Sequence, residues 1–225
     1  FILLLLTKIN DLIKENYAHE LLIKDAQLRA LQAQINPHFL YNTLDTIQWL
    51  ARLQHQNEIA TIAESLGFLL RTSISEKSQT ITLKEELDLL LAYINIQKIR
   101  FGKKIDVSIR IDQKLVLYSI PKLTLQPIVE NSIKYGIEET GRPCRIHIES
   151  EEKEKSFFLH ISDTGPGIDT IKEKKGAGIG LANIHQRMVL LYGTVYGIEI
   201  KANIPCGTVV SIHLPKRSES SCTLS

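Results

Sequence analysis

Three short segments in the second half of the chain carry residues that could hold a nucleotide and its metal ion. The first, LQPIVENSIKYG at 125–136, contains Asn131 and Lys134. On a helix, with about 100° between successive residues, these two side chains lie roughly 60° apart and can reach one ligand together. An Asn carbonyl is the hard oxygen donor that Mg²⁺ prefers, and Mg²⁺ brings substrate phosphates with it. Taken alone, the pair is more typical of a solvated helix face.

The second segment, DTGPG at 163–167, directly follows an apolar stretch with the pattern of a strand. An Asp at the end of a strand can accept a hydrogen bond from an exocyclic amine, and Gly165 and Gly167 let the backbone approach a ring closely. Asp, Gly and Pro also dominate ordinary turns. This segment by itself therefore leaves both interpretations open.

The third segment, GAGIGL at 176–181, opens a predicted helix over 181–192. Its glycines allow backbone N–H groups to approach phosphates at a helix N-terminus. The segment is not a Walker loop, which needs Gly-Lys followed by Ser or Thr, and it lacks the third glycine of a dinucleotide fingerprint. The polar and basic residues 168–175 that precede it are typical of a mobile lid over a nucleotide.

A candidate nucleophile lies in the first half, within the sequence INPHFLYNTL at 35–44. On a helical wheel, Asn42, Asp45 and Trp49 fall within roughly 40° of His38, while the apolar residues fall on the opposite side. An exposed neutral imidazole can attack a γ-phosphoryl group at neutral pH. An ordinary surface histidine at a helix N-terminus is the commoner interpretation. For the histidines on predicted strands we expect no chemical role.

The composition excludes some classes of partner. With 27 basic and 25 acidic side chains the formal net charge is +2, so the chain offers no global electrostatic reason to bind nucleic acid. The three cysteines have no metal-ligand spacing, and their odd number argues against a disulfide framework. A reducing, cytosolic compartment fits them best.

The chain begins with the apolar run FILLLL. This run is too short to span a bilayer, which takes roughly 20 apolar residues, and it lacks the flanks of a signal peptide. It is either the end of a transmembrane helix or the first turns of a buried helix, and we favour the former. Apolar residues at spacings of seven, three and four over 21–35 then predict a short coiled-coil seam, in a helix that pairs with a copy of itself.

Helical periodicity continues over 38–54 and 58–75, and the short polar turn between these segments predicts a helical hairpin. The polar stretch 75–82 reads as a linker. Thr82, with Glu85 three residues later, forms a capping box that predicts the start of a helix ending near residue 100.

After Gly102 the apolar residues alternate with polar ones, as strands require. Helical patterns interrupt the alternation twice, so we expect an α+β fold in which helices cover one face of a mixed sheet. The strands are expected at 105–111, 146–148, 157–161 and 210–214, and the helices at 122–135 and 181–192.

In their order and spacing, the three glycine- and Asn-containing segments resemble the GHKL ATPases, which include histidine kinases, DNA gyrase, Hsp90 and MutL. Asn131 matches the N box, DTGPG the first glycine box and GAGIG the second. The resemblance implies that the chain binds ATP and Mg²⁺, with Asn131 on the metal and Asp163 on the adenine amino group. It also implies a set of further ATP-binding residues: Lys134, Tyr135, Gly165, Gly167, Ile168, Gly176, Gly178, Ile179, Gly180, Leu181 and Thr208.

The sequence QINPHFLYNTL, followed by WLA at 49–51, resembles the LytS/YesM-type sensor histidine kinases, and the match extends through 125–136 and 180–187. In that family the His is phosphorylated, and a membrane-anchored homodimer passes the phosphate to the Asp of a response-regulator receiver domain. The resemblance implies that this chain is the cytoplasmic domain of a cell-membrane protein. It also implies a hairpin that forms a four-helix bundle in the dimer, followed by a GHKL (Bergerat-type) α/β sandwich.

The resemblance divides the chain into four expected parts. These are a membrane-proximal signalling helix or coiled coil at 1–36, a dimerisation and histidine phosphotransfer hairpin at 37–80, a GHKL ATP-binding catalytic domain at 81–217 and a tail at 218–225.

Two departures from the wider family pattern affect the mechanism. Phe39 stands where most histidine kinases have an acid after the phosphoacceptor, so the general base is unassigned, although Asn42 could orient the imidazole. Pro127 stands where gyrase-like ATPases have a catalytic Glu, which argues against autonomous ATP hydrolysis. A GHKL-type serine protein kinase and a catalytically degenerate ATP-binding module are the alternatives.

Overall fold

The computed structural model describes residues 37–74, 78–167 and 179–217. The expected coiled coil, the apolar run at 1–6 and the tail at 218–225 lie outside the described residues. The chain divides into two compact units, residues 1–43 and 44–225. None of the described helices is both long enough and apolar enough to cross a membrane.

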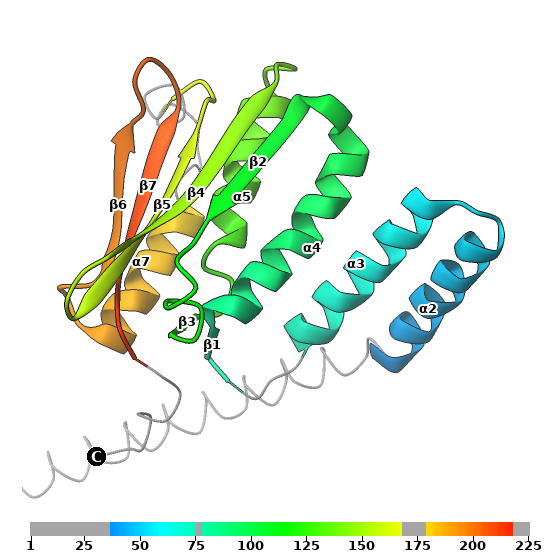
Figure 1. Cartoon of the computed structure of the whole chain (residues 1–225), viewed down its shortest axis with the longest axis horizontal. Helices are drawn as coiled ribbons and strands as arrows, with labels where there is room; N and C mark the ends of the chain where they lie inside the picture. The colour runs from blue at the N-terminus through cyan, green and yellow to red at the C-terminus, as the bar shows by residue number, and fades with distance from the viewer. Residues whose placement is uncertain (1–36, 75–77, 168–178, 218–225) are drawn as a thin grey trace, which may run out of the picture. The chain divides into compact units, whose positions relative to one another are not determined.

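The predicted helical hairpin is confirmed, with both helices within one residue of the expected bounds. Helix α2 is Pro37–Leu53 and α3 is Asn57–Ile74 (Figure 1). Ala51 of α2 and Ala60 of α3 are buried, and Gln48 of α2 donates to the Glu64 carboxylate of α3 at 2.9 Å. Arg52 also pairs with Glu64 at 2.9 Å, but both side chains are largely exposed, so this pair adds little stability.

Helix α4, Leu83–Phe101, begins as the sequence predicts. The Thr82 hydroxyl accepts a hydrogen bond from the Glu85 N–H at 3.2 Å, and the Glu85 carboxylate accepts one from the Thr82 N–H at 2.8 Å. The end of the expected linker is not irregular, however. Thr80–Thr82 forms a short strand, β1, which pairs antiparallel with β3, Ser119–Pro121. Three-residue strands are too short to show a period in the sequence.

The alternating segments form a five-stranded sheet in the order β2–β4–β5–β7–β6. Strands β2 and β4 are parallel, and the other neighbours are antiparallel. Strand β6, at the edge of the sheet, is not among the expected strands. The strands are β2 Ile105–Arg110, β4 Cys144–Glu152, β5 Ser156–Asp163, β6 Gly197–Ala202 and β7 Thr208–Pro215.

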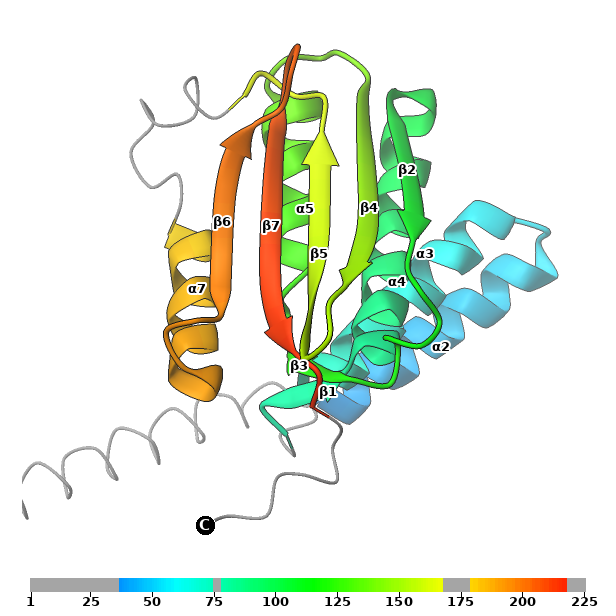
Figure 2. The ribbon, with the colours of Figure 1, turned by 60° about the vertical axis from the view of Figure 1, so that its left-hand side comes forward.

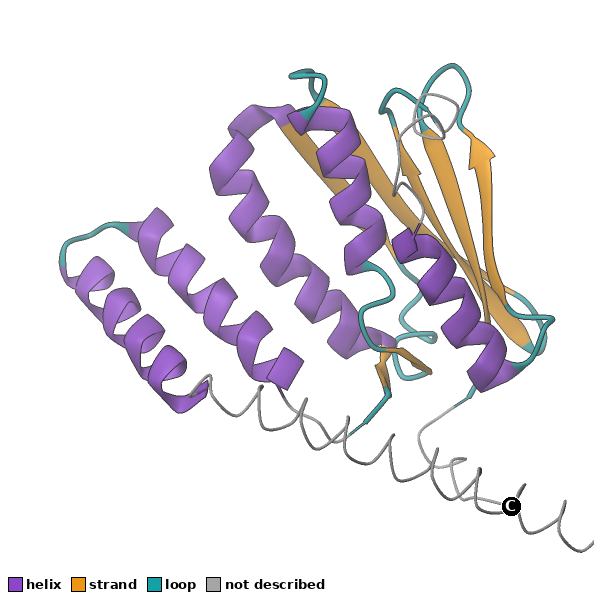
Figure 3. Ribbon diagram, turned by 180° about the vertical axis from the view of Figure 1, so that it is seen from behind, coloured by secondary structure: helices purple, strands orange, loops and turns teal. Residues whose placement is uncertain are grey.

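Helices α4, α5 (Gln126–Ile133) and α7 (Ile179–Tyr192) cover one face of the sheet, as Figure 3 shows from the helix side. Figure 2 shows the opposite face, which carries no helix within residues 78–167 and 179–217. The expected fold class is therefore confirmed. The predicted helix at 122–135 begins later than expected, at Gln126, and continues as a π-helical turn over Lys134–Glu138.

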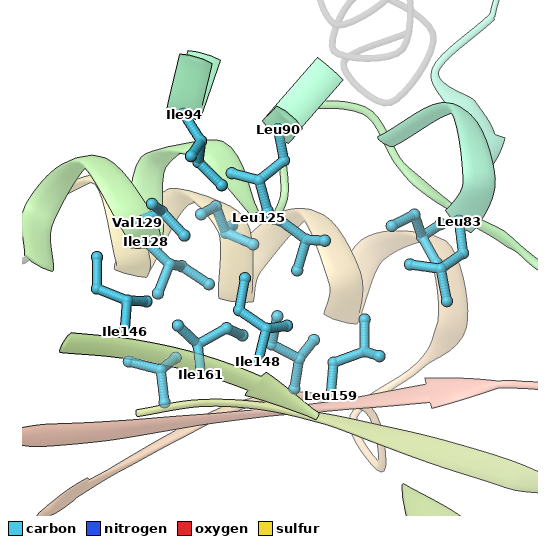
Figure 4. Close-up of a cluster of buried hydrophobic side chains, with 14 of the residues drawn as sticks. Leu83, Leu90, Ile94, Leu125, Ile128, Val129, Ile146, Ile148, Leu159 and Ile161 are labelled. Atoms are coloured by element: carbon cyan, nitrogen blue, oxygen red, sulfur yellow. The ribbon is translucent and has the colours of Figure 1, made fainter. Parts of the chain in front are cut away.

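The core lies between the helices and the sheet (Figure 4). Leu90 and Ile94 of α4 and Leu125 before α5 meet strand residues such as Ile148 and Leu159, and each of these side chains is at most 3% exposed. Full burial of one such side chain contributes about 1.5–3 kcal/mol. The alternation of each strand therefore fixes which of its faces the helices cover.

A buried carboxylate explains the late start of α5. Glu86 of α4 is 1% exposed and accepts three backbone hydrogen bonds, from Leu123 at 3.0 Å, Thr124 at 2.7 Å and Leu125 at 2.8 Å. These N–H groups precede α5, so Glu86 caps a helix from 37 residues away. Arg187 of α7 donates to the Leu123 carbonyl at 3.2 Å. Burial raises the pKa of Glu86, whereas the three N–H groups and Arg187 lower it.

We expect Glu86→Gln to lower the free energy of unfolding by about 3 kcal/mol, because the amide places its own N–H groups against backbone donors and removes the charge that faces Arg187. Urea unfolding measures the change. The matched control is Asp88→Asn, an exposed residue of the same helix, for which we expect a change within about 0.5 kcal/mol. Equal losses in the two variants would contradict the role given to Glu86.

Candidate functional site

The side chain of Asp163 lies at the end of β5 and is 8% exposed. Its Oδ1 atom accepts hydrogen bonds from the N–H groups of Gly165 at 2.9 Å and Thr208 at 3.1 Å. Its Oδ2 atom accepts one from the Ser132 hydroxyl at 2.9 Å. Three elements, α5, the turn after β5 and the start of β7, thus meet at one carboxylate. The structure brings together Asp163, Gly165 and Thr208, which the motifs had grouped.

The backbone around Asp163 is packed so closely that two positions exclude a side chain. A Cβ atom at Gly207 would lie 1.9 Å from the Asp163 carbonyl oxygen, and the φ of Gly207 is +103°. A Cβ atom at Gly136 would lie 2.8 Å from the Cys144 sulfur. Because burial raises the pKa of the Cys144 thiol, this thiol stays neutral beside the carboxylate.

The other N-box residues lie on α5 and the π-helical turn. Asn131 is half-buried, one residue before the buried Ser132. Lys134 is exposed, and its Nζ lies 5.3 Å from the centroid of the half-buried Tyr135 ring, a cation–π contact. Asn131 therefore lies beside the residue that contacts Asp163, while the Lys134 ammonium is turned toward the neighbouring ring.

The second glycine box is described only in part. Gly180 is exposed and Leu181 is half-buried, both in the first turn of α7. Ile179 begins this helix, and its backbone alone is described. Ile168, Gly176 and Gly178 lie outside the described residues. Gly167 has a φ of +88°, the left-handed region that favours glycine.

His38 and Asn42 lie on the first turns of α2 and are both exposed. The Asn42 amide nitrogen is 3.4 Å from each ring nitrogen of His38, so it can contact either nitrogen and favours neither. This agrees with the expectation from the helical wheel that His38 projects away from the apolar face. An exposed imidazole beside an amide is accessible to a second reactant.

Three residues that contact Asp163 were not predicted from the sequence. They are Ser132, Gly207 and Asn203, whose side-chain amide donates to the Asp163 carbonyl oxygen at 2.8 Å. Ser132 had a visible signal, because a polar residue on the apolar face of a helix needs a buried partner. Asn203 and Gly207 lie in the loop before β7, and only the fold brings that loop to β5. Within the described part of the chain, no group of three or more His, Cys, Asp or Glu residues could hold a metal ion.

Two family models match the chain. The model described as histidine kinase matches residues 26–105. The model described as histidine kinase-, DNA gyrase B-, and HSP90-like ATPase matches residues 119–218, which include Asp163 and all residues that contact it.

The chain is also similar in sequence to sensor histidine kinases and sensor proteins. The chain is 43% identical to sensor histidine kinase YesM of Bacillus subtilis over 217 residues, which are 96% of this chain and 38% of the relative. It is 32% identical to sensor protein LytS of the same species, over 86% of this chain and 34% of that protein. For sensor histidine kinase BtsS of Escherichia coli K12 the values are 30%, 88% and 35%. The chain thus spans less than two-fifths of the length of these relatives.

A solved structure, the catalytic domain of histidine kinase ThkA, aligns with 61% of this chain and 97% of its own at a TM-score of 0.48 and 22% identity. The family relation rests on the sequence matches and not on this superposition.

We expect Gly207→Ala to lower the free energy of unfolding by at least about 2 kcal/mol, because the new methyl group would overlap the Asp163 carbonyl oxygen. Gly141→Ala is the matched control. Gly141 also has a positive φ, +69°, but a Cβ atom there meets nothing within 4 Å. Backbone strain alone should cost about 1 kcal/mol. If guanidinium unfolding showed the same loss for both variants, the close packing at Asp163 would not be the cause.

Proposed function

The chain belongs to the histidine kinase family of GHKL ATPases, and on that basis we propose that it is the kinase core of a two-component sensor, which transfers the γ-phosphoryl group of ATP to His38. The observation that carries the proposal is the Asp163 carboxylate, which three elements hold in place at the end of β5. A buried carboxylate with fixed oxygens suits the recognition of a base, because it accepts a hydrogen bond from an exocyclic amine.

The ATPase family match supports ATP as the ligand. Asp163 would accept from the adenine amino group, with Thr208, Gly165 and Gly167 around the base. Gly180, in the first turn of α7, and Gly176 and Gly178, which precede this helix in the sequence, would bring backbone N–H groups to the phosphates, as a helix N-terminus does for anions. Ile168, Ile179, Leu181 and Tyr135 complete the proposed contacts.

The donor set fits Mg²⁺ bound together with phosphates. Asn131 offers a carbonyl oxygen from the helix that contacts Asp163, and few other protein ligands are needed where phosphate oxygens and waters complete the octahedron. When bound, the ion would offset negative charge on the phosphates. Lys134, exposed one turn later, would add a positive charge on the same side.

The transfer itself needs little from the protein besides the nucleophile. A ring nitrogen of His38 would attack the γ-phosphorus, the bond from phosphorus to the bridging oxygen would break, and ADP would leave with that electron pair. Asn42 would orient the ring. Phe39 has no group that accepts a proton, so the proton released by the ring goes to another acceptor, which we leave unassigned.

The hairpin supports a homodimer. Trp49, Leu50, Leu53 and Ile59 expose between 46% and 60% of their surface although they are large and apolar. Such exposure is typical of a face that a partner covers, here the hairpin of a second copy in a four-helix bundle. We further propose that a response-regulator receiver domain takes the phosphate, and that the chain is the cytoplasmic part of a protein anchored in the cell membrane.

The phosphoacceptor can be tested with γ-labelled ATP and Mg²⁺. We expect the chain to incorporate label that is lost in acid and kept in alkali, as a phosphoramidate is, and we expect His38→Gln to abolish it. The control is His55→Asn in the hairpin turn, where an Asn tolerates the φ of +55°. Acid-stable label would indicate a serine kinase, and ATP binding without any label would indicate a degenerate module.

The metal assignment has its own test. We expect Mg²⁺ to tighten ATP binding to the wild type, and Asn131→Ala to remove most of this gain while leaving metal-free binding nearly unchanged. Calorimetric titration with and without Mg²⁺ measures both values. Asn95→Ala, an exposed Asn on α4, is the control. An undiminished Mg²⁺ effect in Asn131→Ala would remove Asn131 from the metal site.

A further inference from the structure

Ser132 is the only polar side chain among the buried residues of α5, and it is 7% exposed. Its hydroxyl oxygen lies 2.9 Å from Asp163 Oδ2 and 3.3 Å from the carbonyl oxygen of Ile128, one turn earlier. A hydroxyl has one proton, so it donates to one of these acceptors at a time. The carboxylate is both nearer and charged, and a charge-assisted hydrogen bond is the stronger of the two. Ser132 therefore donates to Asp163.

This bond determines which acceptor position of Asp163 remains for a ligand. An ionised carboxylate has about four lone-pair positions. Oδ1 accepts from the N–H groups of Gly165 and Thr208, and Oδ2 accepts from Ser132. Counting donors in the described part of the chain, one position remains, and it is on Oδ2. A ligand donor must therefore share that oxygen with the Ser132 hydroxyl.

We propose that Ser132 determines the base specificity of the nucleotide site: it fixes Asp163 Oδ2 so that its remaining acceptor position selects a purine with an amino group at C6. A 6-amino group supplies the proton that this position requires. A 6-oxo group would place a second acceptor against the carboxylate with no proton between them. The inference rests on the proposed binding of ATP and explains its selectivity for adenine.

Asp163 without the Ser132 hydroxyl would not select a 6-amino purine, because a water molecule could replace that hydroxyl. The two backbone N–H groups hold Oδ1, but the plane of the carboxylate is fixed only when both oxygens are held. Without Ser132, a water molecule can take its place beside Oδ2. A water can donate to the carboxylate and to a 6-oxo group at once, so it would accommodate the wrong base.

The test compares the affinities for ATP and for inosine triphosphate, which carries a 6-oxo group, by calorimetry and without any phosphoryl transfer. We expect the wild type to bind ATP at least about tenfold more tightly, because a site built to accept from an N–H group rejects an analogue that lacks it. In Ser132→Ala we expect this ratio to fall about tenfold, because ATP binds more weakly and inosine triphosphate, bridged by the water, binds more tightly.

Two further variants isolate the hydroxyl. Ser162→Ala removes a hydroxyl from the residue directly before Asp163, which contacts the His147 carbonyl oxygen at 3.5 Å, and we expect the wild-type ratio. Ser132→Cys keeps the shape of the side chain and fills the space of the hydroxyl with a larger atom that is a much weaker donor, and we expect the ratio to fall as in Ser132→Ala. A wild-type ratio in Ser132→Cys would show that volume and not the hydroxyl matters, and it would overturn the inference.

The outcomes separate the inference from the proposed function. If the wild type binds both nucleotides equally, adenine recognition at Asp163 fails, and the inference fails with it. If the wild type prefers ATP and Ser132→Ala keeps the full preference, only the inference is overturned. An equal loss of affinity for both nucleotides in Ser132→Ala also overturns it, because the hydroxyl would then support the shape of the site and not its choice of base.

Discussion

The structure around the candidate site depends on one constraint, the need to keep a nearly buried carboxylate satisfied at the end of β5. A buried carboxylate without hydrogen bonds costs several kcal/mol, so donors must come from wherever the fold can supply them. For Asp163 these donors come from α5, from the turn that follows β5 and from the start of β7. The glycine at 207 follows from the same constraint, because Thr208 at the start of β7 can reach the carboxylate only if the residue before it touches the backbone of Asp163.

Glu86 satisfies the same constraint at the other end of α5. Its carboxylate takes three consecutive backbone N–H groups before the helix, and Ser132 within the helix donates to Asp163. Helix α5 is therefore held at its start by α4 and further along by β5. This is why a helix of only eight residues, Gln126–Ile133, can present Asn131 in a defined position although an isolated helix of this length would not be stable.

Local patterns predicted the parts of the fold that local interactions determine. The hairpin, the capping box at Thr82 and the alternating strands were visible because each depends on residues a few positions apart. The start of α5 was expected too early, because the group that caps it, Glu86, lies far upstream. Strands β1 and β3 are too short to show a period, and β6 was missed.

The sequence motifs also predicted part of the candidate site. The motifs indicated Asp163, Gly165 and Thr208, which the structure brings together, while the roles of the site residues and the bounds of the four expected parts stay predictions. Ser132, Asn203 and Gly207 were missed, because their contact with Asp163 exists only once segments between 31 and 44 residues away are folded against β5.

The bond between Glu86 and the loop before α5 also has a mechanical consequence. Glu86 accepts three hydrogen bonds of 2.7–3.0 Å from consecutive residues before α5. If α4 shifted by one residue relative to these residues, all three bonds would break. Helix α4 is therefore tied directly to the start of α5, and we expect the two helices to move together. Helix α3 packs along α4, so a rotation or displacement of α4 would be carried through Glu86 to the start of α5 and to Asn131, less than two turns into that helix.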